Sequence, residues 1–177
     1  MVERGLFIGR FQPFHQGHLY ALKWIAERER EVVIAVGSAQ HSYSFRNPFT
    51  LGERLEMISL CLKEKELWGR TIVAGVPDTN GQHSLWVQVV KTCCPHFSRV
   101  YTNEPLTRLL FEEAGYRVIG IPFFNRELYE GTRVRTLIAE GGDWESLVPQ
   151  AVAVVIKEIN GIDRIRQLYQ LEKGKGK

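Results

Sequence analysis

The chain has 177 residues, of which 44% are hydrophobic, 24% charged and 11% aromatic, and this composition excludes disordered, collagenous and fibrous proteins. A chain of this length buries roughly two-thirds of its unfolded surface, so its core needs neither disulfides nor a structural metal. The formal net charge is +3, but three of the lysines lie in the C-terminal KGKGK, and the rest of the chain is close to neutral. Because nucleic-acid binding needs a basic stripe with interleaved aromatic residues, we expect no nucleic-acid partner.

The cysteines and the apolar runs indicate the compartment. Cys61, Cys93 and Cys94 are an odd number and lack the paired CxxC spacing of a zinc site, which favours a reducing environment. The start MVERGLFIGRF contains only a short apolar run with an arginine inside it, and no stretch approaches about 18 apolar residues. We therefore expect a cytoplasmic protein without a signal peptide or a membrane span.

Short β-rich runs alternate with helical patterns in the first two-thirds of the chain. The runs have little polar alternation, which suits a parallel sheet covered on both faces. The alternation predicts an α/β fold with a Rossmann-like, doubly wound parallel sheet. The expected strands are Gly5 to Ile8, Glu31 to Val36, Thr71 to Val76, Arg99 to Thr102 and Arg117 to Ile121, and the helices are Gly17 to Glu29, Leu51 to Glu66, Leu85 to Thr92 and Pro105 to Ala114.

The pattern becomes purely helical after Pro122. The expected helices are Arg133 to Glu140, Pro149 to Ile159 and Gly161 to Leu171, and no linker, repeat or low-complexity segment separates them from the rest. We therefore expect a single domain over residues 1–177, whose part from about residue 131 to 172 forms a helical C-terminal cap.

The segment GRFQPFHQGH, residues 9–18, follows the first strand and enters the first helix. In an open α/β sheet this loop delivers backbone amides and a helix N-terminus to an anion. His15 and His18 are three residues apart, so both imidazoles can face one pocket, with Arg10 alongside. A phosphate site is favoured over metal ligation or two chance surface histidines. The Walker and GxGxxG patterns are absent, which disfavours kinases and dehydrogenases.

Two other arginines are candidate anion ligands. In GTRVR, residues 131–135, Thr132 is expected to cap the following helix and Arg135 lies in its first turn. A cation is unfavourable at the positive end of a helix unless an anion offsets it, although a solvated arginine is the alternative. Arg133 is expected to face solvent. The long loop from Gly37 to Thr50 contains Arg46, which is either a phosphate clamp or a solvent-facing residue.

Trp86 opens a helix after the loop PDTNGQHSL. An aromatic ring there offers a flat face to a heterocycle bound at the edge of the sheet, and packing in the core is the alternative.

The motifs together resemble a known family. HxGH near the start and TxxR in a late helix are similar to the HxGH and ISxTxxR signatures of the nucleotidyltransferase superfamily. The ordered series GRFQPFHQGH, GSAQ, RNPFT, GER, SLWV, RVYT, GYRV, GTRVR, GDW, SLVP and EINGIDRI resembles archaeal-type nicotinamide-mononucleotide adenylyltransferases over nearly the whole chain.

The resemblance implies that ATP and nicotinamide mononucleotide (NMN) condense to NAD and pyrophosphate by direct in-line attack. It also implies a homo-oligomer, by resemblance a hexamer, and Mg²⁺ held mainly by ATP phosphates rather than by a carboxylate cage. The implied catalytic residues are His15, His18, Arg10, Arg46 and Arg135; the implied ATP-binding residues are Gly9, Phe11, Gln12, Thr132 and Val134; and the implied NMN-binding residues are Ser38 and Trp86.

The chain departs from the family pattern at three places. Glu130 replaces the usual serine of the late motif, TNEP (residues 102–105) replaces a Gly-Asn turn, and His83 stands where asparagine is usual. The deamidated mononucleotide is therefore a possible competing acceptor. The alternatives are another HxGH adenylyltransferase, with flavin mononucleotide or phosphopantetheine as acceptor, and a regulator that binds nucleotides without turnover.

Overall fold

The computed structural model describes residues 3–122, 124–125 and 129–174. Its centre is a five-stranded sheet with the order β3-β2-β1-β4-β5, in which all neighbouring strands are parallel. The predicted doubly wound α/β fold is confirmed, with each strand within two residues of its expected ends. The strands are β1 Arg4–Gly9, β2 Glu31–Val36, β3 Thr71–Gly75, β4 Arg99–Tyr101 and β5 Arg117–Ile119.

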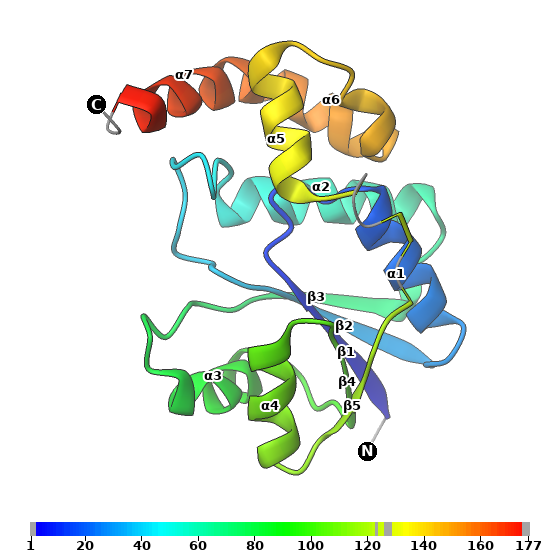
Figure 1. Cartoon of the computed structure of the whole chain (residues 1–177). Coiled ribbons are helices and arrows are strands. Elements are labelled where there is room, and N and C mark those ends of the chain that lie inside the picture. The colour runs from blue at the N-terminus through cyan, green and yellow to red at the C-terminus, as the bar shows by residue number, and fades with distance from the viewer. Residues whose placement is uncertain (1–2, 123, 126–128, 175–177) are drawn as a thin grey trace.

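The helices cover both faces of this sheet (Figure 1). On one side lie α1 Gln16–Ala26 and α2 Leu51–Glu64, and on the other lie α3 Trp86–Cys93 and α4 Pro105–Glu113. The chain then adds α5 Gly131–Glu140, α6 Gln150–Glu158 and α7 Gly161–Gly174, with short 3₁₀ turns at Trp68–Arg70, His83–Leu85 and Glu145–Leu147. The expected helical C-terminal region is therefore present.

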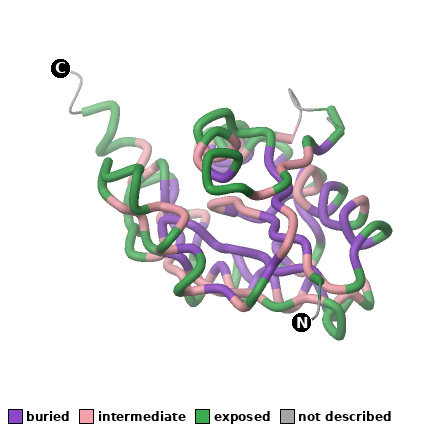
Figure 2. The backbone as a smooth tube through the Cα atoms, turned by 90° about the horizontal axis from the view of Figure 1, so that it is seen from below, coloured by how far each residue is buried: buried purple, intermediate pink, exposed green. Residues whose placement is uncertain are grey.

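The two faces of the sheet explain why the strands lack polar alternation. Phe7 and Ile34 belong to the core cluster shared with α1 and α2, whereas Leu6 and Val33 belong to the cluster shared with α3 and α4. Successive side chains of a strand point to opposite faces, so both sets must be apolar when both faces are covered. Buried backbone accordingly runs through the middle of the molecule, and exposed backbone lies at its periphery (Figure 2).

We call the cluster that contains Phe7 and Ile34 the first core cluster, and the one that contains Leu6 and Val33 the second. The C-terminal helices share the first core cluster with the sheet and α2. Ile138, Ile156 and Ile165, one from each of α5, α6 and α7, are fully buried in it. Arg164 of α7 donates to both carboxylate oxygens of Glu53 at 2.7 and 2.8 Å. The Glu53 side chain also accepts from the Thr50 amide in the capping box of α2. The Glu53 carboxylate therefore caps the N-terminus of α2 and also anchors α7.

Among the described residues, none of the helices is both long enough and apolar enough to span a membrane.

Candidate active site

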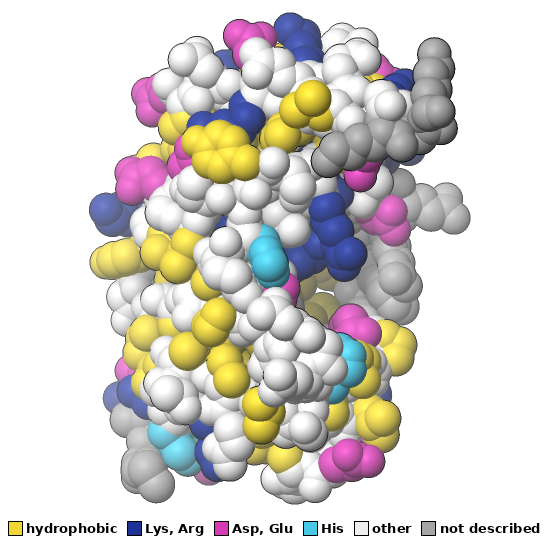
Figure 3. Space-filling model, turned by 90° about the vertical axis from the view of Figure 1, so that its left-hand side faces the viewer, with side chains coloured by type: hydrophobic (Ala, Val, Ile, Leu, Met, Phe, Trp, Pro, Cys, Tyr) yellow, Lys and Arg dark blue, Asp and Glu magenta, His cyan; other side chains and the backbone are white. Residues whose placement is uncertain are grey.

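Two adjoining cavities lie where the strand order reverses, beyond the carboxyl ends of β1 and β4. Their volumes are about 500 and about 470 Å³, each within the range of a small-molecule site. Lys and Arg side chains gather beside a hollow on this face of the molecule (Figure 3). The cavity of about 500 Å³, which His15 and His18 line, is called the first cavity, and the cavity of about 470 Å³, which Ser38 and Trp86 line, is called the second cavity. Both are lined by Ile8, Arg10, Thr102 and Glu104, so they share one wall.

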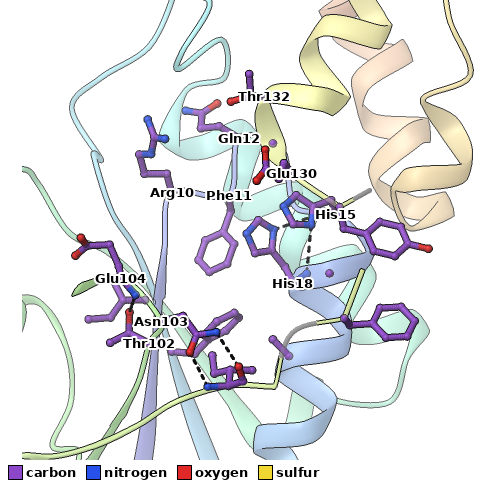
Figure 4. Close-up of a pocket in the computed structure, with 18 of the residues that line it drawn as sticks. Arg10, Phe11, Gln12, His15, His18, Thr102, Asn103, Glu104, Glu130 and Thr132 are labelled. Atoms are coloured by element: carbon purple, nitrogen blue, oxygen red, sulfur yellow. Dashed lines mark hydrogen bonds between the residues drawn. The ribbon is translucent and has the colours of Figure 1, made fainter. Parts of the chain in front are cut away.

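His15 and His18 stack face to face in the first cavity, with ring centroids 3.5 Å apart (Figure 4). His15 is the N-cap of α1. Its Nδ1 accepts from the His18 amide at 3.3 Å, and the Nδ1 of His18 accepts from the His15 amide at 3.2 Å. Because both Nδ1 atoms are acceptors, the neutral rings carry their protons on Nε2. Each ring is therefore held as an Nε2–H donor.

The histidine pair is neutral at physiological pH. Burial lowers the pKa of His15 to about 3, with a further contribution from the positive charge of Arg135. Burial, and then the neighbouring His15, lower the pKa of His18 well below its usual value. The pair can thus donate hydrogen bonds to an anion, but it supplies no positive charge.

The positive charge of the site comes from arginines. Arg135 is buried in the wall of the first cavity, and it donates to the carbonyl oxygen of Gln12 at 2.8 Å and to the hydroxyl of Thr132 at 3.1 Å. Burial lowers its pKa to about 10, and repulsion by Arg10 and Arg46 adds to this effect. The buried Nη1 of Arg10 and Nε of Arg135 have no hydrogen-bond partner among the described residues. Clustered cations with free donors make an anion site.

Two helix N-termini strengthen this anion site. The amino ends of α1 and α5 lie at the first cavity, since His15, Gly131 and Thr132 line it. A helix N-terminus carries roughly half a positive charge and unpaired N–H groups. Gly131 leaves room for this arrangement, because a Cβ there would crowd Arg135 Nη1 at 3.0 Å and the Gln12 carbonyl oxygen at 3.3 Å.

The second cavity combines an aromatic ring with polar groups. Trp86, the first residue of α3, is partly buried against the second core cluster and also lines the cavity, so the ring packs in part against the core and has one part open to the cavity. Ser38 donates from Oγ to Asp78 Oδ2 at 2.8 Å. The exposed Arg46 lines this cavity together with Arg10 and is not part of the first one.

Comparisons with known proteins agree with this geometry. The profile of the cytidylyltransferase-like family matches residues 6–137. The nicotinamide-nucleotide adenylyltransferase of Methanothrix thermoacetophila is 45% identical over 167 residues, which cover 94% of this chain and 96% of that protein. The protein of the same name from Ignicoccus hospitalis is 48% identical over 167 residues, covering 93% of this chain and 97% of that protein. The chain belongs to the nicotinamide-nucleotide adenylyltransferase family.

A solved structure shares the fold. The bifunctional NMN adenylyltransferase/ADP ribose pyrophosphatase of Francisella tularensis, complexed with AMP and a manganese ion, superposes with a TM-score of 0.69 at 20% sequence identity. The alignment covers 96% of this chain and 56% of the bifunctional chain, so this chain spans about half of its length.

Some adenylyltransferase residues predicted from sequence serve the scaffold in this structure. Gln12 lines the first cavity, but its side-chain amide is bonded to the scaffold: it donates to the Phe49 carbonyl at 2.9 Å and accepts from the Phe49 amide at 3.0 Å. Val134 is fully buried in the first core cluster rather than at either cavity. Phe11 does line the first cavity, where its ring packs 4.8 Å from that of His18.

The structure shows the local roles of Thr132 and Gly9. Thr132 does not cap α5: the N-cap is Glu130, without a side-chain cap bond, and the Thr132 hydroxyl instead accepts from Arg135. Thr132 is the second residue of the helix, two positions after the N-cap, so its hydroxyl is not placed to cap the free amides. Gly9 lines the second cavity, where a Cβ would approach the Phe11 ring to 2.8 Å, so glycine is needed for close packing.

The departures at Asn103 and Glu104 have structural roles. Asn103 joins the ends of β4 and β5, because its amide donates to the Ile121 carbonyl at 2.7 Å and accepts from the Ile121 amide at 2.9 Å. Glu104 caps α4 through the Leu106 and Thr107 amides. Burial raises the pKa of Glu104, but the hydrogen bonds from Thr107 and Leu106 outweigh it and lower the pKa overall. Glu130 is exposed at the rim of the first cavity, near the histidine pair (Figure 4).

Sequence reasoning missed Asp78 and Arg54. Asp78 follows β3 and lines the second cavity, where it accepts from Ser38; its position just after a parallel strand is the signal that could have found it. Arg54 is fully buried and donates to three carbonyls at the ends of β1 and β2. The signal for Arg54 is a charged residue within the apolar stripe of α2.

Proposed function

We propose that this protein transfers the adenylyl group of ATP to NMN, forming NAD and releasing pyrophosphate. The observation that carries the proposal is the pair of cavities that meet at Arg10, beyond the end of β1. One cavity offers a polyanion site and the other offers an aromatic face with polar neighbours. A reaction between two nucleotides needs both sites side by side.

The first cavity is the proposed ATP site. The histidine pair, Arg135 and two helix N-termini supply donors for the triphosphate. Thr132 and Phe11 lie on the same cavity. The second cavity is the proposed NMN site, where Trp86 would stack on the nicotinamide ring and the Ser38–Asp78 pair would meet its polar groups.

The chemistry needs no nucleophilic side chain. The 5′-phosphate of NMN is ionised at neutral pH, and one of its oxygens attacks the α-phosphorus of ATP in line with the leaving group. The bond from the α-phosphorus to the bridging oxygen breaks, and pyrophosphate leaves with its electron pair. The protein contributes alignment of the two phosphates and stabilisation of the charge that develops on them.

The side chains divide this work by position. The Nε2–H groups of His15 and His18 donate to ATP phosphate oxygens, with His18 at the α-phosphate. Arg10 lies on the wall common to both cavities, so it can contact the reacting phosphates of both substrates. Arg135 neutralises the departing pyrophosphate, and Arg46 approaches the phosphates from the NMN side.

Mg²⁺ is the proposed cofactor. Among the described residues there is no group of three or more His, Cys, Asp or Glu that could hold a metal ion, so ATP oxygens and water would supply most ligands, with the Glu130 carboxylate at the cavity rim as a candidate ligand from the chain. When bound, the ion neutralises phosphate charge. His15 and His18 donate hydrogen bonds but carry no charge, which fits a site where a cation accompanies ATP.

The experiment is pyrophosphate release with ATP and Mg²⁺, run in parallel with NMN, its deamidated form, flavin mononucleotide and phosphopantetheine, and with products identified by mass. NAD formation is the expected result. If the protein turns over only flavin mononucleotide or phosphopantetheine, that compound is the acceptor in place of NMN. ATP binding without any product would indicate a regulator, and Glu130→Ser would then be the first variant to assay.

We also propose a cytoplasmic homo-oligomer, a hexamer by resemblance to the family. Light scattering of the purified protein tests the assembly, and a mass of six chains is expected. A monomer at micromolar concentration would contradict it.

A further inference from the structure

Arg54 is an unusual residue for the position it occupies. It lies on α2 among the fully buried Met57, Ile58 and Cys61, and its own side chain has 0% exposure. Burying a cation is costly unless hydrogen bonds or an opposite charge compensate for it. No carboxylate forms an ion pair with Arg54 among the residues that the structure describes. A function other than simple core packing is therefore expected.

All hydrogen bonds of the Arg54 guanidinium go to backbone carbonyls. Nη1 donates to the carbonyl oxygens of Arg10 at 2.8 Å and Gly37 at 2.7 Å. Nη2 donates to the carbonyl oxygen of Ser38 at 3.0 Å, and Nε donates to that of Thr50 at 3.3 Å. The single atom Nη1 therefore ties the chain leaving β1 to the chain leaving β2.

These two chain segments carry the two substrate sites of the proposed function, on which this inference rests. Arg10 is on the wall common to both cavities, and Ser38 lines only the second one. The spacing between the two carbonyls held by Nη1 thus sets the spacing between the side chains that would meet ATP and those that would meet NMN.

The backbone at both anchored points is strained. Phe11, directly after Arg10, has φ of 51°, and Ser38, directly after Gly37, has φ of 50°. Residues with a Cβ rarely adopt this left-handed conformation, and they keep it only where surrounding bonds enforce it. The hydrogen bonds of Arg54 adjoin both residues, and the bond from Ser38 Oγ to Asp78 adds a third strand end to the same network.

We infer that Arg54 is a positioning residue: its guanidinium fixes the ATP and NMN sites relative to each other without touching either substrate. Arg54 then contributes to alignment rather than to the affinity of each substrate alone. An error of about 1 Å in alignment can reduce a rate by roughly 100-fold. Satisfying buried carbonyls is the alternative role, and it would affect stability only.

The variants that test this are Arg54→Lys and Arg54→Gln. Lysine keeps the charge, but its compact ammonium on a flexible stem cannot reproduce the rigid guanidinium fork that donates to all four carbonyls. Arg70 provides the matched control. It donates to the carbonyls of Ala26, Glu29 and Arg30 near the amino ends of β2 and β3, so Arg70→Lys and Arg70→Gln remove the same kind of bonds away from the cavities.

The measurements are kcat and KM for NAD formation, the thermal midpoint, and calorimetric affinities for ATP, NMN and NAD. NAD spans both cavities, so its affinity reports their relative position without turnover. In the Arg54 variants we expect kcat to fall about 100-fold and NAD to bind at least tenfold more weakly, while the Kd values of ATP and NMN change less than about threefold. The Arg70 variants should keep the kcat of the parent protein.

Three results would overturn the inference. The first is an unchanged kcat and NAD affinity in folded Arg54 variants. The second is a loss of kcat that is no larger than the loss of folded protein. The third is an equal loss of kcat in the Arg70 variants. The parent protein distinguishes the two proposals. If it turns over another acceptor, the NMN assignment fails and the Arg54 comparison is made with that acceptor and its product. If it binds no dinucleotide product and turns over nothing, both proposals fail.

Discussion

At the scale of single residues, His18 combines a fixed ring with one free donor. Its Nδ1 accepts from the His15 amide, so only Nε2–H is free for a ligand. We expect His18→Ala to lower kcat by roughly 100- to 1,000-fold, as loss of one donor to transition-state charge does, while the unfolding free energy falls by about 1–2 kcal/mol. Steady-state kinetics and urea unfolding check this. His96→Ala, at an exposed position, is the control. A drop in kcat no larger than the drop in folded fraction would contradict the assignment.

Trp86 is the residue where packing and binding compete. Its ring touches the second core cluster and lines the second cavity. We expect Trp86→Ala to weaken NMN binding by roughly 10- to 100-fold, the usual cost of losing a stacked base, and to leave ATP binding within about threefold. Calorimetric titration of each substrate checks it. Trp68→Ala, with the ring 47% exposed just before β3, is the matched control. Equal weakening of both substrates would indicate a core role alone.

At the scale of elements, the start of α1 makes stability depend on pH. His15 and His18 form a reciprocal capping box with both rings neutral, and burial followed by the charge of Arg135 lowers the pKa of His15 to about 3. The unfolded chain binds a proton at each histidine near pH 6.5, so below that pH it binds more protons than the folded state. The unfolding free energy should therefore fall as the pH drops from about 7 to 5, by up to about 1.4 kcal/mol per pH unit for each histidine.

His15→Asn separates this effect from other titrations, because asparagine also accepts at an N-cap but does not titrate. Urea unfolding between pH 5 and 7 should show a smaller pH slope in this variant. His96→Asn, which changes an exposed histidine that lines neither cavity, is the control. An unchanged slope in His15→Asn would mean that His15 takes up protons equally in the folded and the unfolded chain, which would contradict this account.

At the scale of the whole molecule, the cavities gather cations that repel one another. Arg10, Arg46 and Arg135 come from three distant parts of the chain, and burial and mutual repulsion lower the pKa of Arg10 and Arg135. A polyanion should relieve this repulsion. Inorganic triphosphate at about 100 times its Kd should add about 2.7 kcal/mol of stability and raise the melting temperature by roughly 5–10 °C. Scanning calorimetry checks it, and added salt should reduce the shift.

Arg135→Met should remove most of this shift, whereas Arg166→Met on the exposed face of α7 should preserve it. An equal shift in both variants would place the triphosphate elsewhere.

The sequence by itself determined the fold class, the elements and most of the segments that line the first cavity, because these depend on local patterns. Apolar runs without alternation specify buried parallel strands, Thr50 and Glu53 specify the start of α2, and a histidine pair after a strand specifies a helix start that faces a cavity. The family resemblance rests on motifs of the same local kind.

The tertiary structure alone decided which polar groups serve a ligand and which serve the scaffold. The amide of Gln12 is occupied by Phe49, Val134 is in the core, and Arg46 belongs to the second cavity. Arg54 acts on carbonyls contributed by two other segments. Each of these outcomes depends on partners far away along the chain. Buried backbone groups that lack a hydrogen-bond partner within the sheet need a side chain as partner, and the fold decides which side chain lies within reach. Spacing along the sequence does not contain that information.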